Sequence, residues 1–356
     1  MNRELLRVGL IGVGGVGKLH FEAYRKAQGV RVVAVCDTSA QRLESLSSSA
    51  KTALYGDAAK MLECEKLDIA CVLTPPSSHE RLTELCTRHG VHVFCEKPLA
   101  LSLDAADRMM GYAKSAGVEL FYGSSYRFLP AIVAARALII AGNIGEVRLL
   151  REQSLGARGL DEIQLMHDSH YPFGGPGGFA MGLADHGIHL IDIFSWLMES
   201  RVRASTGRGN ISGQPAGPEF LHMAFENHAI GQLVYDEGTF PTELPNEGLF
   251  SGGDGWEVDG FVIAGNWSKY PGCIHVYGST ASLRIFHYAN RLVRIDKTGI
   301  REIQVRGRPS PFHFATQIDQ FADDIQTGRS ASTPGSVGYE VLRVMLSAYE
   351  NGFSQT

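Results

Sequence analysis

A glycine-rich turn near the start of the chain constrains its fold more than any other feature. The segment GVGGVG follows a strand-like apolar run, Arg7–Ile11, and opens a helical pattern that reaches about Gln28. In a GxGxxG turn, the first glycine permits the bend, the second lets backbone amides approach a pyrophosphate, and the third lets the helix pack closely on the sheet. The helix N-terminus adds free N–H groups that favour phosphate. The residues expected to contact a dinucleotide here are Gly12, Val13, Gly14, Gly15, Val16 and Gly17.

Strand and helix patterns alternate over the first 125 residues. After the first strand, further strands are predicted at Val30–Cys36, Ile69–Leu73, Val91–Cys95 and Val118–Tyr122, with helical patterns between most of them. Such alternation is typical of parallel βαβ units in a doubly wound sheet. We therefore expect an α/β protein whose residues 1–125 form an N-terminal Rossmann dinucleotide-binding domain.

The pattern changes after residue 125. A helix is predicted over about residues 130–141, and an irregular stretch rich in Gly, Pro and His follows at 156–178. Short strands and turns dominate from Leu221 to Ile303, which favours a mixed or antiparallel sheet. We expect residues 126–356 to form a C-terminal α+β domain with a large open sheet.

Composition and charge exclude several classes of protein. The chain has 33 Lys and Arg against 38 Asp and Glu, so no large positive field is available to bind nucleic acid. The apolar runs are too short to span a membrane, and the charged first residues speak against a secretory signal peptide. Six cysteines without CxxC spacing indicate reduced thiols in a cytoplasmic protein, with a cysteine zinc site as the less favoured alternative.

Asp37 ends the second predicted strand, where an acid can accept hydrogen bonds from both hydroxyls of the adenosine ribose. The same charge repels a 2′-phosphate, and residues 38–40 supply no arginine to hold one. This favours NAD over NADP as the cofactor. The alternative is that Asp37 only caps the turn into the next helix.

Two polar motifs follow the next strands. Thr-Pro-Pro-Ser-Ser-His lies at residues 74–79 and Cys-Glu-Lys-Pro-Leu at 95–99. Ligands bind at the carboxyl ends of strands in open α/β sheets, so both motifs are expected to line the cofactor site. An exposed Glu96–Lys97 ion pair is the alternative. The residues expected to bind the cofactor here are Thr74, Pro75, Pro76, His79, Glu96 and Lys97.

Taken in order, these motifs resemble the Gfo/Idh/MocA oxidoreductases, which are named for glucose-fructose oxidoreductase and inositol dehydrogenase. The resemblance continues at YRFLP (126–130), GNIGEV (142–147), DHGIHLID (185–192) and QFADDI (320–325). It implies a second domain whose open sheet packs against partner subunits in a homo-dimer or homo-tetramer. It also implies hydride transfer, with Lys97, Asp185 and His189 as catalytic and substrate-binding residues.

The chemistry of these residues suits the implied reaction. Oxidation of a secondary alcohol removes a hydride and a proton, and histidine is the best base near neutral pH. Asp185 and His189 are spaced i, i+4, so on an α-helix they share a face and Asp185 can orient the ring. Lys97 can stabilise developing charge on the oxygen. Tyr126, Arg127 and His167 are expected to contact substrate hydroxyls.

The sequence therefore predicts an NAD-dependent dehydrogenase that acts on a sugar, inositol or related polyol. An NAD-dependent glycosidase that oxidises its substrate transiently is the first alternative, and a non-catalytic regulator that binds dinucleotide or sugar is the second. No metal is expected, because the nicotinamide supplies the hydride chemistry, and a metal site from His167, Asp168 and His170 is the less favoured alternative. Residues 209–268 contain nine acids and no Lys or Arg, which favours an uncharged substrate or else a solvated surface.

Overall fold

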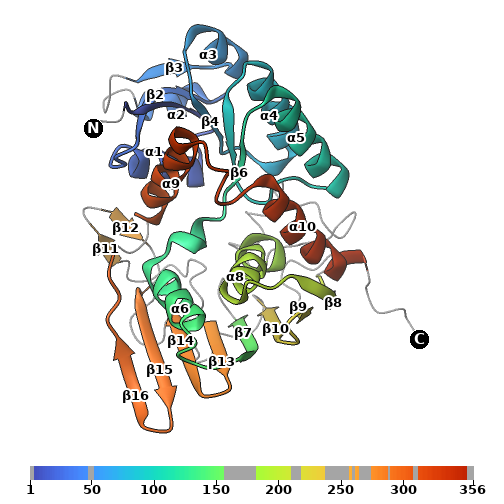
Figure 1. Cartoon of the computed structure of the whole chain (residues 1–356). Helices are drawn as coiled ribbons and strands as arrows, with labels where there is room; N and C mark the ends of the chain where they lie inside the picture. Colours follow the sequence, from blue (N-terminus) through green and yellow to red (C-terminus); the bar gives the residue numbers. More distant parts are fainter. Residues whose placement is uncertain are drawn as a thin grey trace. The chain divides into compact units, whose positions relative to one another are not determined.

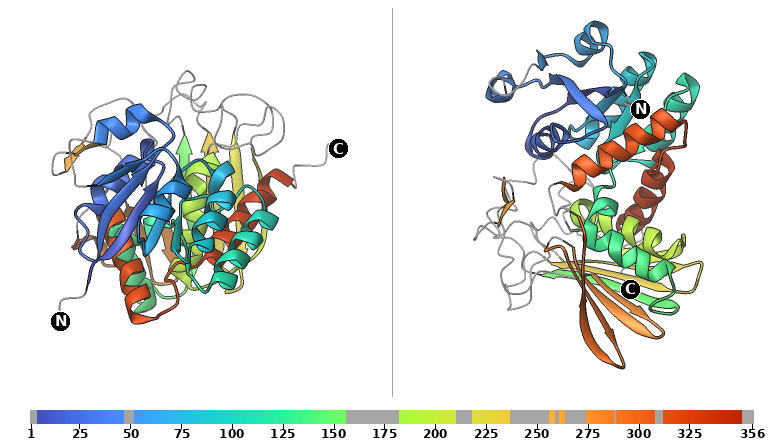
Figure 2. Two further views of the ribbon diagram at one scale, coloured as in Figure 1. Left: turned by 90° about the horizontal axis from the view of Figure 1, so that it is seen from above. Right: turned by 60° about the vertical axis from the view of Figure 1, so that its left-hand side comes forward.

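The computed structural model describes residues 4–46, 52–155, 182–209, 218–236, 256–258, 261–263, 274–287, 289–307 and 312–350. The chain divides into two compact units (Figure 1; Figure 2). The first contains residues 1–125 and 310–342, and the second contains residues 126–309 and 343–356.

The first unit is built on a six-stranded sheet with the order β3-β2-β1-β4-β5-β6, in which every pair of neighbours is parallel. The order reverses between β1 and β4, and this switch point is where an open α/β sheet leaves a crevice for ligands. The strands are β1 (Leu6–Ile11), β2 (Val30–Cys36), β3 (Ala53–Tyr55), β4 (Ile69–Val72), β5 (His92–Cys95) and β6 (Leu120–Tyr122).

Local signals explain where several helices of this unit begin and end. Asp57 accepts a hydrogen bond from the Lys60 amide at the start of α3, and Ser102 accepts one from Ala105 at the start of α5. Gly117 ends α5 in the left-handed region at φ +68°. The helices are α1 (Gly15–Tyr24), α2 (Ala40–Leu46), α3 (Ala58–Cys64), α4 (His79–Arg88) and α5 (Leu103–Ala116).

A helix from the far end of the chain completes the first unit. α9 (His313–Thr327) lies beside α1 (Figure 1) and buries Phe321, whose ring stacks on Phe121 of β6. Its Asp319 accepts hydrogen bonds from the amides that follow α1, at 2.8 and 2.7 Å. This segment was expected in the C-terminal domain but belongs to the first unit. Periodicity shows that a helix has an apolar face but not which core buries that face.

The second unit is built on an eight-stranded mixed sheet with the order β16-β15-β14-β13-β7-β10-β9-β8. β7 and β10 are parallel, and the other neighbours are antiparallel. A two-stranded ribbon pairs β11 (Trp256–Val258) with β12 (Phe261–Ile263). The strands of the large sheet are β7 (Val147–Leu155), β8 (Val202–Arg208), β9 (Glu219–Phe225), β10 (Ile230–Asp236), β13 (Ile274–Gly278), β14 (Ala281–Phe286), β15 (Arg291–Asp296) and β16 (Gly299–Ile303).

Helices α6 (Pro130–Ile140) and α8 (Ile188–Met198) pack on this sheet (Figure 1). A single π-helical turn, Gly182–Gly187, leads directly into α8. The last helix, α10 (Gly335–Glu350), contains the boundary between the units, which falls after Leu342.

These sheets confirm the predicted fold class, a parallel Rossmann sheet followed by a mixed sheet. Four elements were not predicted from the sequence: β3, α3, β7 and β8. β3 has three residues, too few for a pattern. β7 carries Arg151, Glu152 and Gln153 in succession, and a carboxylate at a buried strand position gives no apolar signal.

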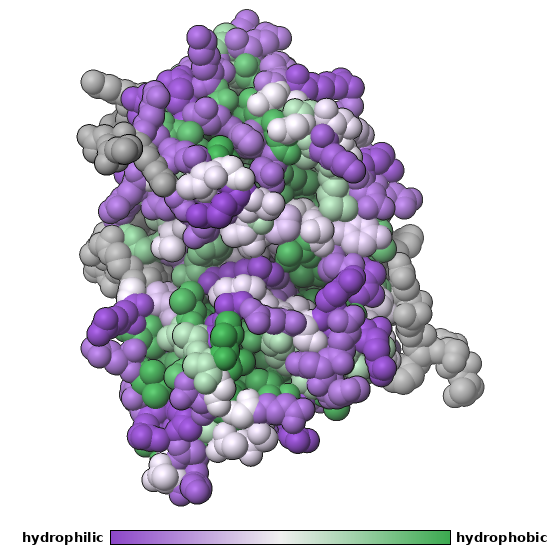
Figure 3. Space-filling view, viewed as in Figure 1, coloured by the Kyte–Doolittle hydropathy of each residue, from purple (hydrophilic) through white to green (hydrophobic). Residues whose placement is uncertain are grey.

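The surface carries an apolar patch on α6. Val133 and Ile140 project from this helix with 46% and 52% of their surface exposed, and apolar residues gather there on the face that Figure 3 shows. Among the described residues, no helix is both long and apolar enough to cross a membrane.

Candidate active site

The glycine turn adopts a conformation that other residues would not tolerate. Gly12 has φ +92°, and a Cβ there would lie 2.8 Å from the Thr74 side chain. A Cβ at Gly17 would lie only 2.1 Å from the Gly12 carbonyl oxygen. The start of α1 therefore packs directly on the end of β1, and among the described residues no side chain caps its N-terminal amides. This is the geometry that a GxGxxG turn needs to bind a pyrophosphate.

Asp37 joins the end of β2 to this turn. The carboxylate is 5% exposed and accepts hydrogen bonds from the Val13 amide at 2.9 Å and the Ser39 amide at 2.8 Å. Arg42 lies 3.5 Å from it and is also the nearest side chain to Gly14. Asp37 therefore supports the turn into the next helix and also lies beside the phosphate-binding glycines, where it could bind ribose.

The loops after β4 and β5 are held together by a buried histidine. His79 Nε2 is 2.8 Å from the Thr74 carbonyl oxygen, and Nδ1 is 3.0 Å from that of Pro98. Burial lowers the pKa of His79, and its hydrogen bonds to the backbone carbonyl groups of Thr74, Leu99 and Pro98 oppose that shift. His79 is fully buried, and its contacts support the loop at Thr74, Pro75 and Pro76.

Glu96 is buried between α1 and β5 rather than exposed in a surface ion pair. One carboxylate oxygen is 2.8 Å from His20 Nε2, and the other accepts a hydrogen bond from the Lys97 amide at 2.9 Å. Burial raises the pKa of Glu96, but the His20 hydrogen bond and the nearby charges of His20 and Lys97 outweigh it and leave the pKa below its ordinary value. Glu96 therefore fixes the backbone at the half-buried Lys97.

In the second unit, Asp185 and His189 lie in two different types of helix. Asp185 lies in the π turn and His189 in the first turn of α8, so the α-helical spacing used in the sequence analysis does not describe this pair. Both are half-buried. The ring of Tyr126 stacks on the His189 imidazole, with centroids 4.0 Å apart and planes 3° from parallel. Tyr126 thereby fixes the orientation of the ring expected to act as base.

Arg127 is paired with Asp192 of α8. Its Nε donates to one carboxylate oxygen at 2.8 Å, and its Nη2 donates to the other. The guanidinium also lies over the Trp196 ring, 5.5 Å from the centroid. Two-point pairing uses much of its donor capacity, so Arg127 anchors α8 as well as being a candidate substrate contact. His167 lies outside the described residues.

Comparison with known proteins identifies the family. Residues 6–124 match the model of an oxidoreductase family with an NAD-binding Rossmann fold, GFO_IDH_MocA, and residues 132–284 match the GFO/IDH/MocA C-terminal domain. The D-apiose dehydrogenase of Rhizobium rhizogenes is 31% identical over 248 residues, 69% of each chain. The chain belongs to the Gfo/Idh/MocA oxidoreductase family.

Two further comparisons show how far the likeness extends. The D-apiose dehydrogenase of Paraburkholderia graminis is 31% identical over 232 residues, which are 64% of this chain but only 59% of that protein. An Agrobacterium radiobacter oxidoreductase, solved with NAD⁺, L-tartaric acid and magnesium, aligns over 98% of this chain and 97% of its own. Its TM-score is 0.76 at 21% identity, so that structure supports the fold alone.

The close contact at Gly17 gives the first testable prediction. Gly17→Ala forces a methyl group against the Gly12 carbonyl oxygen, so we expect the variant to lose dinucleotide binding or to misfold. Gly111→Ala in α5 is the matched control, because a Cβ at Gly111 has nothing within 4 Å and alanine favours the helix. The measurement is NAD titration by calorimetry, with near-ultraviolet circular dichroism as the check on folding. Equal NAD affinity in the two variants would contradict the account.

Proposed function

We propose that this protein is an NAD-dependent dehydrogenase that oxidises a secondary alcohol of a sugar, inositol or related polyol. The observation that carries the proposal is the glycine turn, whose uncapped helix N-terminus and close glycine contacts suit a pyrophosphate. The family adds support, since two relatives are named as dehydrogenases of the sugar D-apiose. The test is NADH formation, followed by absorbance, against a panel of sugars, inositols and sugar acids. Absence of turnover across the panel would favour a regulator that binds without catalysis.

The proposed cofactor contacts come from three loops at the carboxyl ends of strands. The amides of the glycine turn bind the pyrophosphate, Asp37 accepts the ribose hydroxyls, and the Thr74–Pro76 loop lines the crevice beside them. His79 and Glu96 act as supports, because their polar atoms already contact these loops. NAD would supply the hydride acceptor, and the residues of these three loops would position the cofactor and exclude water.

The proposed catalytic residues are Lys97, Asp185 and His189. His189 removes the hydroxyl proton, Asp185 stabilises the resulting imidazolium, and Lys97 donates a hydrogen bond to the same oxygen. The stacked Tyr126 ring supports His189, and Glu96 holds the backbone of Lys97. The contacts among the described residues do not favour a glycosidase. Net formation of NADH would distinguish a dehydrogenase from a glycosidase that returns the hydride to its substrate.

We further propose an uncharged substrate, because residues 209–268 contain no Lys or Arg and phosphate recognition normally recruits these residues. Arg127, a cation expected near the substrate, is already paired with Asp192. A cytoplasmic location and assembly through the open sheet stay predictions from the sequence.

The preference for NAD is tested at Asp37. Asp37→Asn removes the charge that repels a 2′-phosphate and leaves Arg42 beside the ribose site. We expect the ratio of kcat/KM for NAD to that for NADP to fall by about 5- to 150-fold, equivalent to about 1–3 kcal/mol. Arg42→Ala in the same background should reverse part of this change. A wild-type enzyme that prefers NADP would overturn the assignment.

The catalytic roles are tested by paired substitutions. Lys97→Met should lower kcat about 10²- to 10³-fold and leave NAD affinity largely unchanged, because the lysine acts on the transition-state oxygen. His189→Gln should lower kcat about 10²- to 10⁴-fold. Lys114→Met and His222→Gln, both at exposed positions, are the controls and should match the wild type. If Lys97→Met abolished NAD binding with kcat preserved at saturation, Lys97 would be a cofactor residue instead.

A further inference from the structure

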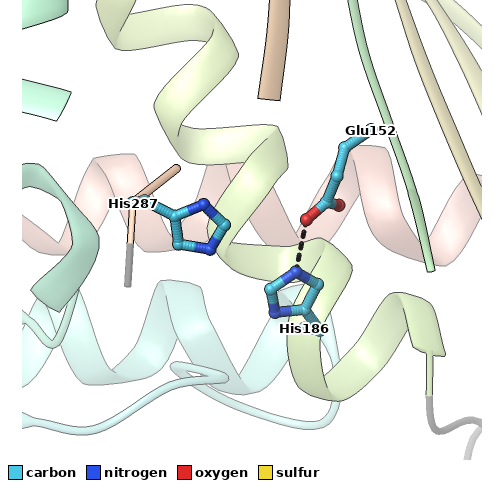
Figure 4. A group of neighbouring side chains, drawn as sticks. All are labelled: Glu152, His186 and His287. Atoms are coloured by element: carbon cyan, nitrogen blue, oxygen red, sulfur yellow. Dashed lines mark hydrogen bonds and ion pairs between the residues drawn. The ribbon is translucent and has the colours of Figure 1, made fainter. Parts of the chain in front are cut away.

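Three potential metal ligands meet in the interior of the second unit. Glu152 comes from β7, His186 from the π turn, and His287 from the residue directly after β14 (Figure 4). All three are at most 1% exposed. One ligand atom from each, an imidazole nitrogen or a carboxylate oxygen, lies within 4.8 Å of the other two. His186 Nε2 and Glu152 Oε1 are the closest pair, at 2.5 Å.

The charges of this cluster suit a cation. The buried Glu152 carboxylate contacts the Tyr235 hydroxyl and the His186 ring, and a cation beside it would offset the cost of burying its charge. The fully buried His287 ring lies beside that of His186, with the two ring centroids 6.1 Å apart. Two imidazoles and one carboxylate are a ligand set that divalent transition metals accept.

The surrounding residues resemble the outer shell of a metal site. The Tyr235 hydroxyl donates to the second Glu152 oxygen at 2.5 Å, and the Tyr126 hydroxyl lies 3.3 Å from His186 Nδ1. In metal sites, a ligating carboxylate and the second nitrogen of a ligating histidine are usually held in this way. The π turn that carries His186 is itself a rare structure, and it occurs mostly at functional sites.

We propose that Glu152, His186 and His287 bind one divalent transition-metal ion, with zinc as the first candidate. The ion cross-links β7, the π turn and the end of β14, and through His186 it fixes the Tyr126 ring that stacks on His189. No metal was expected from the sequence, because the nicotinamide supplies the hydride chemistry. Glu152, His186 and His287 are far apart in the chain and match no spacing motif. The proposal does not depend on the substrate or on the dehydrogenase activity.

The test measures metal binding by the full-length protein. Metal-free protein is dialysed against Zn²⁺, passed over a desalting column and analysed by plasma mass spectrometry. We expect about one zinc per chain in the wild type. In a competition with a chromophoric chelator, Glu152→Gln and His287→Gln should bind at least about 100-fold more weakly, since loss of an outer-shell partner alone typically weakens binding about 10- to 100-fold.

His275→Gln is the matched control, because His275 lies half-buried on β13 of the same sheet outside the cluster. It should bind zinc as the wild type does. A wild-type protein that retains no zinc, or cluster variants that bind it as tightly as the control, would overturn the proposal.

A second readout covers the case in which the cluster variants fail to fold. The wild type is titrated with Co²⁺, whose visible spectrum reports nitrogen and oxygen ligands, and then with Zn²⁺. We expect saturation at about one equivalent of Co²⁺ and loss of the bands when zinc displaces it. Weak bands that grow without saturating indicate adventitious surface binding and overturn the proposal.

Discussion

The contact between Gly17 and the Gly12 carbonyl oxygen is the constraint on which the rest of the first unit depends. With no Cβ between them, α1 begins directly on the end of β1, and no side chain in the described part of the protein caps its N-terminal amides. Asp37 accepts a hydrogen bond from the Val13 amide, so the same turn fixes the end of the neighbouring strand. The phosphate-binding groups and the acid expected to bind ribose therefore derive their positions from two glycines.

Buried polar groups also fix the loops that carry the proposed catalytic and cofactor-binding residues. His79 holds the loops after β4 and β5, and Glu96 bridges His20 to the Lys97 amide. In the second unit, Tyr126 stacks on His189 and reaches His186, which is bonded to Glu152. Residues that carry the proposed reaction are thus supported by groups that water does not reach. Such buried networks rigidify a site only when their members are satisfied.

The sequence predicted the parts of the fold that are encoded locally. β1, β2, β4, β5 and β6 follow apolar runs bounded by turns, and their alternation with helices indicated the parallel sheet. Placement of α9 was not predictable, because only the tertiary structure shows that Phe321 packs on Phe121. The sequence predicts an α-helix where the structure has the π turn, because the wider turn produces no distinct pattern of apolar residues in Gly182–Gly187. Glu152 was not predicted as a functional residue, and Arg127 was predicted as a substrate contact rather than as the partner of Asp192. Both side chains contact partners that are distant in the sequence.

The central claim is that a hydride passes from a carbinol carbon of the substrate to NAD. The most direct measurement uses a substrate from the sugar and polyol panel, deuterated at its carbinol carbons, with mass spectrometry of the NADH formed. The account predicts net NADH that carries the deuterium, together with a slower reaction when hydride transfer limits turnover. Substrate turnover with no net NADH, or NADH without deuterium, would contradict it.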